Sequence, residues 1–310
     1  MRRPGDPKVS RPLETTGARE VPRWEDPRRA LARHGFAPKR SFSQNFLVAE
    51  GVVERIAGEA TRGLDGRTLV ELGPGVGTLT SALLRRGAQV VAVERDRDMA
   101  SALRADLGAI PEFALVEADA ARVDLGALSA SPARPVAVAG NLPYAITGAI
   151  LRALHDQSAA VAYAVVMVQR EVRDRLLASP GDKAYGALTV FTSNVFDVTP
   201  VIAVRPGAFF PPPKVASAVV RLDTRPAPRT VETPAFTALV RAVFAQRRKT
   251  LRNAAGAVFA PREAVAAGLD AAGVDPARRG ETLGVEELGA LATALDKAGA
   301  HRVTREAGSG

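Results

Sequence analysis

Five short apolar runs, separated by stretches with helical spacing, constrain the fold of this chain more than any other feature. The runs are TLVELG (68–73), QVVAVE (89–94), FALVEAD (113–119), PVAVAG (135–140) and YAVVMV (163–168). Their apolar residues are continuous rather than alternating, which is typical of strands buried on both faces. Such strands belong to a parallel sheet with helices on either side. The sequence therefore predicts an α/β fold, and 197–204 and 217–223 are further strands that can pair at the end of the sheet.

The rest of the chain divides into three parts. Residues 1–26 are rich in Pro, Arg and Glu and lack apolar periodicity, which predicts a disordered extension. The Pro/Thr/Arg stretch at 223–234 predicts a boundary between a first domain at 27–224 and a second at 225–298. The second domain shows several short helical patterns and no strand candidate. We expect the last residues, 299–310, to form a flexible tail.

Several classes of protein are disfavoured by composition. Cysteine is absent, which excludes disulfides, thiolate metal sites and a cysteine nucleophile. The three histidines share no spacing typical of a metal site or a catalytic triad, so no metal is expected. The sequence shows neither a signal peptide nor an apolar run long enough to span a membrane. These observations predict a cytoplasmic protein without membrane association.

The net charge of +9 is unevenly distributed. Residues 63–135 hold eight basic and ten acidic residues, so the basic surplus lies in the segments around them. A solvated basic surface and a surface that binds a polyanion are equally compatible with this distribution.

A glycine-rich turn follows the first apolar run. ELGPGVGTLT (71–80) places Glu71, Gly73, Gly75 and Gly77 between a strand and a helix. Glycines there let a ligand approach the backbone, and the start of the helix offers free N–H groups. The dinucleotide pattern is G-x-G-x-x-G, whereas this spacing, E-x-G-x-G-x-G, resembles motif I of S-adenosylmethionine-dependent methyltransferases. A tight structural turn without a ligand is the alternative.

Acidic residues end the next two apolar runs, at the same predicted edge of the sheet. Glu94 can accept hydrogen bonds from both ribose hydroxyls of a cofactor, and Asp119 can accept one from its adenine amine. Either residue alone could be a solvated acid at the end of a strand. Three such features at the carboxyl ends of three successive strands favour a cofactor site.

The fourth apolar run ends in Asn-Leu-Pro-Tyr (141–144). An amine attached to an aromatic ring is a poor nucleophile, because its lone pair is delocalised into the ring. The Asn141 side-chain oxygen and the Leu142 carbonyl can accept its two N–H bonds and favour a pyramidal nitrogen. Pro143 stiffens the turn, and Tyr144 offers a face for a flipped-out base. Catalysis would then depend on positioning and electrostatics without a general base, whereas the alternative is a strand-to-helix turn with a partly buried tyrosine.

Five segments, in this order, are similar to the ribosomal RNA adenine dimethyltransferase family. They are SQNFL (43–47), ELGPGVGTLT (71–80), NLPY (141–144), GAFFPPPKVASAVVRL (207–222) and FAQRRKTLRN (244–253). The resemblance covers residues 28–297 and implies a Rossmann-like methyltransferase domain with a small all-helical C-terminal domain. It also implies N6,N6-dimethylation of adenosines in ribosomal RNA with S-adenosylmethionine as cofactor.

The resemblance implies roles for individual residues. Those that match cofactor-binding positions, together with Gly75 of the glycine turn, are Asn45, Leu47, Gly73, Glu94, Asp119 and Asn141. Phe209 matches the aromatic residue that would hold the target base against Tyr144. Phe210 is also aromatic, so the choice of stacking ring stays open, and a core phenylalanine is the alternative for Phe209.

Two branches of the family remain. The housekeeping branch modifies two adjacent adenosines near the 3′ end of small-subunit rRNA, and the macrolide-resistance branch modifies one adenosine of large-subunit rRNA. PPPKV, QRRKTLRN and DPARRGETLGVEELGAL (275–291) resemble the housekeeping branch, whereas Ser43 is a feature of the resistance type. We expect the housekeeping activity, a role in small-subunit biogenesis, and a monomer acting on rRNA or a pre-30S particle. A non-catalytic RNA-binding assembly factor is a further alternative.

Two basic segments are candidates for RNA contact. Residues 241–252 contain five basic residues and no acidic residue, and 28–40 is also rich in Arg and Lys. The residues singled out are Arg247, Arg248, Lys249 and Arg252 in the first segment and Lys39 and Arg40 in the second. The lack of acidic residues at 241–252 favours phosphate contact over a solvated helix face, which is the alternative.

Overall fold

The structure is a computed structural model that describes residues 9–10, 20–39, 44–131 and 133–302. The chain divides into two compact units, each described here by itself. The sheet unit comprises Met1–Arg173 and Asp197–Thr224, and the helical unit comprises Asp174–Phe196 and Arg225–Gly310. Residues 174–196, which the sequence analysis placed in the first domain, therefore belong to the helical unit.

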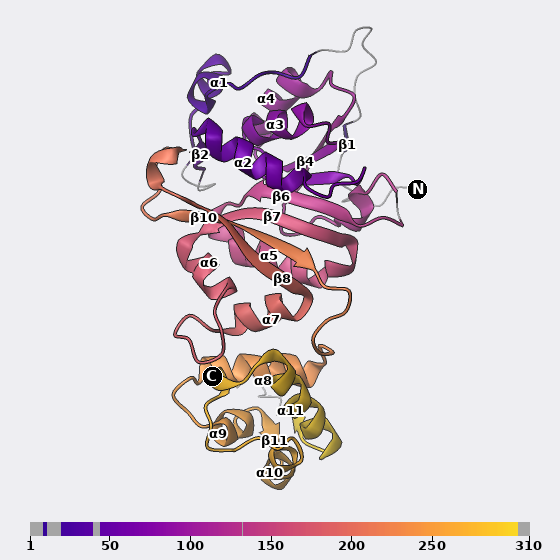
Figure 1. The fold of residues 1–310 in the computed structure, drawn as a ribbon, viewed down its shortest axis with the longest axis vertical. Coiled ribbons are helices and arrows are strands. Elements are labelled where there is room, and N and C mark those ends of the chain that lie inside the picture. The colour runs from indigo at the N-terminus through magenta and orange to yellow at the C-terminus, as the bar shows by residue number, and fades with distance from the viewer. Residues whose placement is uncertain (1–8, 11–19, 40–43, 132, 303–310) are drawn as a thin grey trace, which may run out of the picture. The chain divides into compact units, whose positions relative to one another are not determined.

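An eight-stranded sheet forms the centre of the sheet unit (Figure 1). Its strands, in spatial order, are β1 (Val9–Ser10), β5 (Phe113–Glu117), β4 (Val90–Glu94), β3 (Leu69–Leu72), β6 (Val136–Asn141), β7 (Val161–Gln169), β10 (Ser217–Thr224) and β8 (Phe196–Val204). All five predicted strands are present, and β5, β4, β3, β6 and β7 pair in parallel. The predicted α/β fold is thus confirmed, and β8 and β10 pair at the end of the sheet as expected.

The sheet is mixed rather than purely parallel, because β10 pairs with β7 in the antiparallel sense. The chain adds β4 and β5 on one side of β3 and then returns to add β6 and β7 on the other. Ligands of open α/β sheets bind at such a reversal, outside the carboxyl ends of the strands. The strand order therefore predicts a ligand site at the loops that follow β3 and β6.

Helices cover the sheet. They are α1 (Pro27–Arg33), α2 (Glu50–Thr61), α3 (Thr78–Arg85), α4 (Arg97–Leu107) and α5 (Thr147–Asp156). After β7 the chain forms α6 (Arg170–Leu176), which spans the boundary between the two units. The short 3₁₀ turns are η2 (Gly126–Leu128), η3 (Tyr144–Ile146), η4 (Ser158–Ala160) and η5 (Pro206–Ala208), and a two-stranded ladder joins β2 (Phe46–Leu47) to β9 (Phe209–Phe210).

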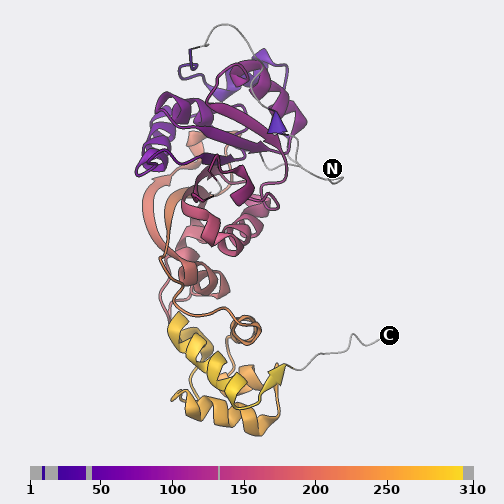
Figure 2. The ribbon, with the colours of Figure 1, turned by 90° about the vertical axis from the view of Figure 1, so that its right-hand side faces the viewer.

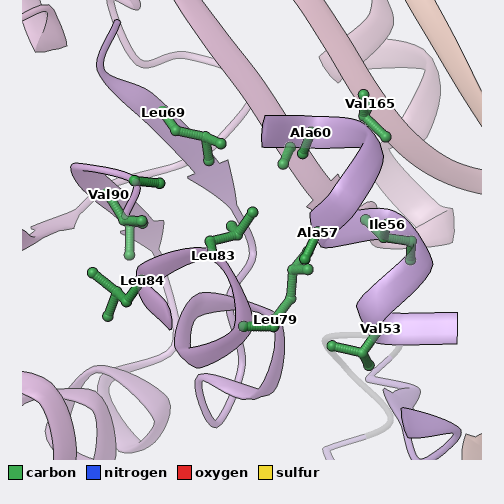
Figure 3. Packing of buried hydrophobic residues seen from close by; sticks show 14 of the residues in the cluster. Val53, Ile56, Ala57, Ala60, Leu69, Leu79, Leu83, Leu84, Val90 and Val165 are labelled. Carbon is green, nitrogen blue, oxygen red and sulfur yellow. The ribbon is translucent and has the colours of Figure 1, made fainter. Parts of the chain in front are cut away.

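The packing of α2 shows how the sequence produces this core. Val53, Ile56, Ala57 and Ala60 recur at helical spacing, so they share one face, and each is fully buried. Figure 3 shows this face near side chains of α3, including Leu83, and near side chains of the sheet strands. Burying a valine or isoleucine side chain such as Val53 or Ile56 stabilises the fold by about 1.5–3 kcal/mol.

Part of the predicted disordered extension makes defined contacts. Val21 and Trp24 pack against the core of the sheet unit, and the Asp26 side chain accepts a hydrogen bond from Arg28 N at 2.9 Å, which caps α1. The remainder of that prediction, at 1–8 and 11–19, lies outside the described residues.

The helical unit has a hydrophobic core of its own. Its C-terminal helices are the orange and yellow ones of Figure 2. Its helices are α7 (Ala187–Val195), α8 (Pro234–Ala245), α9 (Leu251–Gly256), α10 (Arg262–Ala271) and α11 (Val285–Lys297), with the turn η6 (Gly280–Thr282) before α11. Phe236, Leu239 and Leu288 are fully buried in this core. The unit is helical as predicted, except that β11 (Phe259–Ala260) pairs with β12 (His301–Arg302).

The pairing of β12 corrects one further expectation. Residues 301–302 belong to the segment expected to be a flexible tail, yet they form a short strand. The rest of that prediction, at 303–310, lies outside the described residues.

Candidate active site

A cleft opens in the sheet unit beside the carboxyl ends of β3, β4, β5 and β6. It encloses about 1230 Å³ of empty space, part of which is open to solvent. Its lining includes the seven cofactor-binding candidates, Asn45, Leu47, Gly73, Gly75, Glu94, Asp119 and Asn141. Leu142, Pro143 and Tyr144 line it as well. The fold thus brings together residues that are spread over about a hundred positions of the sequence.

The glycine turn after β3 needs glycine for two reasons. Gly73 and Gly75 have φ angles of 72° and 59°, in the left-handed region that side chains disfavour. A Cβ atom on Gly75 would also lie only 2.9 Å from Cε1 of Phe46. The turn therefore leaves its backbone exposed to the cleft, where α3 begins.

Glu94 is held by three backbone N–H groups. Its Oε1 accepts from Arg95 N and Asp96 N, both at 2.8 Å, and its Oε2 accepts from Gly75 N at 3.2 Å. Burial raises the pKa of Glu94, and the three N–H groups act in the opposite direction. A carboxylate has about four acceptor positions, so Oε2 retains room for a donor from the cleft.

Glu71 is a second buried acid of the cleft, to which the sequence analysis assigned no role. It is 1% exposed, and its Oε2 has no hydrogen-bond donor among the described residues. Burial raises its pKa to about 8, Glu94 adds to this effect, and the Thr80 side chain opposes it. Glu71 lines the cleft, so a cationic or N–H group bound there would satisfy its free oxygen.

Asp119 follows β5, and one of its carboxylate oxygens makes only a weak contact. Its Oδ1 accepts from Ala121 N at 3.0 Å, which fixes the turn after the strand. Its Oδ2 has only a long contact of 3.4 Å with the Arg95 guanidinium. This oxygen can accept a hydrogen bond from a ligand in the cleft.

The Asn141 side chain is oriented by a distant backbone group. Its Nδ2 donates to the carbonyl oxygen of Asn45 at 2.9 Å. This bond assigns the orientation of the amide and leaves Oδ1 without a donor among the described residues. Asn45 therefore lines the cleft and also orients the Asn141 side chain through its backbone carbonyl.

The next residues of the Asn-Leu-Pro-Tyr turn are also fixed. Leu142 N donates to the Met167 carbonyl at 3.2 Å, so the start of the turn is tied to β7. The Pro143 carbonyl accepts from Ile146 N at 3.1 Å and from the Thr147 hydroxyl at 3.0 Å. A turn held in this way presents its polar groups in one geometry.

Tyr144 and Phe209 have different environments. Tyr144 lines the cleft, its hydroxyl is 2.6 Å from the Ser217 hydroxyl, and burial raises its pKa. Phe209 is 3% exposed, belongs to the main core, and is absent from the lining of the cleft. Its placement therefore favours the core alternative over base stacking. Phe210 is partly buried, packs against a separate apolar cluster, and does not line the cleft either.

Lys39 of the N-terminal basic segment takes part in ion pairs. Lys39 forms ion pairs of 2.6 Å with both Asp96 and Asp98, and these contacts raise its pKa. Gln44 Nε2 donates to Asp96 at 2.8 Å. Lys39 therefore ties the chain before the cleft to the start of α4, and its charge is already paired with two carboxylates. Arg40 lies outside the described residues, as does Ser43.

The basic residues of the helical unit divide into two kinds. Arg247 forms an ion pair of 2.7 Å with Glu281, so its charge is already compensated. Arg248, Lys249 and Arg252 are exposed and have no acidic partner in the described part of the chain. These three can contact a polyanion without first breaking an ion pair.

Arg279 is a basic residue that was not singled out from the sequence. Leu251 N donates to the Arg278 carbonyl at 2.7 Å, and Arg252 N donates to the Pro276 carbonyl at 3.2 Å. These bonds place the segment before Arg279 beside Leu251 and Arg252, and Arg279 too is exposed without an acidic partner in the described ranges. Only the double arginine in DPARRG could have indicated it from the sequence.

Within the described ranges, no cluster of His, Asp and Glu side chains has the grouping needed to hold a metal ion. No helix in those ranges is long and apolar enough to cross a membrane.

Comparisons with known sequences point to one family. The family model described as "Ribosomal RNA adenine dimethylase" matches residues 35–293. The chain is 48% identical over 283 residues to "Ribosomal RNA small subunit methyltransferase A" of Anaeromyxobacter dehalogenans, which covers 88% of this chain and 99% of the relative. It is 46% identical over 275 residues to the protein of the same name from Myxococcus xanthus, covering 87% and 95%.

Solved structures agree on the fold. A dimethyladenosine transferase from Plasmodium falciparum has a TM-score of 0.70 at 23% identity, covering 82% of this chain and 98% of that one. The 23S rRNA methyltransferase ErmE has a TM-score of 0.61 at 31% identity, covering 81% and 100%.

Proposed function

The chain belongs to the ribosomal RNA adenine dimethylase family, and from this premise we propose that it dimethylates adenosines of small-subunit rRNA. The proposed product is N6,N6-dimethyladenosine at two adjacent positions near the 3′ end of that RNA, formed during small-subunit biogenesis. The observation that carries the choice of substrate is the 48% identity to a small-subunit methyltransferase, against 31% to a large-subunit enzyme.

S-adenosylmethionine is the proposed cofactor, because the chemistry of the cleft fits it. Gly73 and Gly75 line the cleft without side chains, so a ligand can approach the backbone of the turn. Glu94 can accept from the ribose hydroxyls, and the free oxygen of Asp119 can accept from the adenine amine. The unpaired oxygen of Glu71 suits the ammonium group. When bound, the cofactor supplies a methyl group on a sulfonium.

The Asn-Leu-Pro-Tyr turn is proposed to activate the target amine. The bond from Asn141 Nδ2 to Asn45 leaves Oδ1 to accept one N–H of the adenine amine, and the Leu142 carbonyl accepts the other. Both bonds favour a pyramidal nitrogen whose lone pair points toward the methyl group. The ring of Tyr144 supports one face of the base. No general base is needed, because the product ammonium loses its proton to water.

Four residues of the helical unit are proposed to contact RNA phosphates. They are Arg248, Lys249, Arg252 and Arg279, whose charges have no acidic partner among the described residues. Arg247 is instead assigned to the stability of the helical unit, through Glu281. Phosphate contacts of this kind supply affinity rather than sequence specificity.

A large-subunit target is the second candidate, carried by the likeness to ErmE. Primer extension on rRNA from a strain that lacks its own small-subunit dimethyltransferase distinguishes the two. With this chain expressed, we expect new stops at two adjacent adenosines of small-subunit rRNA, and the Asn141→Ala variant is expected to give none. Stops in large-subunit rRNA alone would instead assign the macrolide-resistance activity.

A non-catalytic assembly factor predicts a third pattern. Such a protein would bind small-subunit particles and produce no stop with either the wild-type chain or Asn141→Ala. Calorimetric titration with S-adenosylmethionine gives an independent answer, since a factor without the cofactor site would show no binding.

A further inference from the structure

The hydroxyl of Tyr144 has a specific partner on a distant strand. It lies 2.6 Å from the hydroxyl of Ser217, 73 residues along the chain. Ser217 is 1% exposed and begins β10, whereas Tyr144 is only partly buried and lines the cleft. One residue of the active-site turn is thus joined through its side chain to the interior of the sheet.

Ser217 is a fixed point of the fold. Its backbone pairs with Gln169 of β7, and the neighbouring Ala216 carbonyl accepts from Arg170 N at 2.9 Å. A serine side chain has one rotatable bond before its hydroxyl, so a buried serine on a paired strand holds that hydroxyl within a small volume. Its position follows from the sheet and not from the loop that contains Tyr144.

The ring of Tyr144 needs such an external restraint. Its backbone lies in the short turn η3, and its Cα–Cβ and Cβ–Cγ bonds permit several ring orientations. A hydrogen bond at the far end of the ring removes most of them. Burial raises the pKa of the phenol, so the group is neutral at physiological pH and can both donate and accept.

We propose that Ser217 is a positioning residue for methyl transfer, because it fixes the ring of Tyr144 against which the target adenine is held beside Asn141. This inference rests on the proposed function of the cleft. Transfer rates respond steeply to small displacements of the acceptor, since catalysis here depends on alignment rather than on an acid or a base. A ring free to rotate would hold the amine in the productive geometry for a smaller fraction of the time.

A double-mutant cycle tests this assignment. Ser217→Ala removes one hydroxyl, Tyr144→Phe removes the other and keeps the ring, and the third variant carries both changes. We measure the single-turnover rate constant at saturating cofactor and saturating rRNA particle. Loss of one hydrogen bond is expected to lower it about 3- to 10-fold in each single variant. The double variant is expected to equal the single ones, because the same interaction is removed.

A matched control separates positioning from general stability. Tyr163→Phe removes another buried tyrosine hydroxyl bond of the sheet unit, from Tyr163 to the Ala60 carbonyl at 2.7 Å, outside the cleft lining. It is expected to lower the melting temperature and leave the rate constant of the folded enzyme unchanged. S-adenosylmethionine affinity, measured by calorimetry, is expected to be the same in all four variants.

The inference is overturned if Ser217→Ala transfers methyl groups at the wild-type rate, or if the effects of the two single changes multiply in the double variant. If Ser217→Ala does not fold, a wild-type rate in Tyr144→Phe overturns it equally. The wild-type chain is assayed on both small- and large-subunit particles. Turnover on the large subunit alone would refute the proposed substrate, and the cycle would then be measured on that particle.

Discussion

Glu94 and Glu71 are two buried acids in one cleft, and their surroundings give them different roles. Three backbone N–H groups stabilise the charged form of Glu94, whereas Glu71 has an oxygen without a donor among the described residues. The sequence indicated Glu94 because it ends an apolar run. It gave no reason to single out Glu71 within the motif, because its burial depends on β4 and β6, which flank it in the sheet.

Replacing Glu94 with Gln is expected to weaken S-adenosylmethionine binding by about tenfold or more. The variant keeps the shape of the side chain but loses charge-assisted hydrogen bonds, which contribute about 1.5–3 kcal/mol each. Isothermal calorimetry measures the change, and the exposed Glu112→Gln serves as the matched control. Equal affinities in the two folded variants would remove Glu94 from the cofactor site.

Glu71 is expected to make stability depend on pH. Its pKa of about 8 lies above the value near 4.3 for an unfolded chain, so the folded state retains a proton that the unfolded state has lost. The free energy of unfolding should therefore fall as pH rises from about 4.5 to 8, by up to a few kcal/mol. Glu71→Gln cannot ionise, so its curve should be flatter over this window. The free energy of unfolding is measured by urea denaturation at each pH, without cofactor. The same dependence on pH in the wild-type protein and in Glu71→Gln would contradict the assignment.

At the scale of elements, the long strands could be predicted and the short ones could not. Continuous apolar runs identified β3 to β7, because burial on both faces leaves a clear pattern. The two-residue strands β2 and β9 carry too few residues for any periodicity, yet their pairing places Phe46 and Leu47 at the cleft. The burial of Phe209 could not be predicted for the same reason. The family motif suggested that Phe209 stacks on a base, whereas its pairing with Leu47 places it in the core.

The glycine turn provides a prediction at this scale. Gly75→Ala forces a side chain into a left-handed backbone conformation, which costs about 1–2 kcal/mol, and brings Cβ against Phe46. Both thermal stability and S-adenosylmethionine affinity are expected to fall. Gly51→Ala, in α2 where an added Cβ meets nothing within 4 Å, is the control and is expected to be neutral or slightly stabilising. Unchanged cofactor affinity in Gly75→Ala would separate the turn from the cofactor.

At the scale of the whole molecule, the distribution of free charge decides where RNA is expected to bind. The sequence showed the basic segments but not their partners, because Lys39 meets Asp96 and Arg247 meets Glu281 only after folding. Among the described residues singled out from the sequence, Arg248, Lys249 and Arg252 keep charges without an acidic partner, and Arg279 of the helical unit is similar in this respect. The ion pairs thus reduce the number of basic residues that are candidates for RNA contact, which composition alone could not do.

Replacing Arg248, Lys249 and Arg252 with Gln should flatten the salt dependence of binding to small-subunit particles. Each lost phosphate contact removes about 0.9 from the slope of log affinity against log salt for a duplex site, so three remove about 2–3 units. Arg247→Gln is expected to destabilise the helical unit and leave the slope nearly unchanged. A wild-type slope in the triple variant would show that these side chains are only solvated.

We propose that this chain transfers methyl groups from S-adenosylmethionine to the N6 atoms of adenosines in small-subunit rRNA. The most direct test of this proposal is transfer by the purified protein to small-subunit particles isolated from a strain without the modification, followed by mass spectrometry of the RNA nucleosides. The prediction is N6,N6-dimethyladenosine at two adjacent positions with the wild-type protein and none with Asn141→Ala. It would be contradicted by unmodified particles with the wild-type protein, or by dimethyladenosine at the wild-type level with Asn141→Ala.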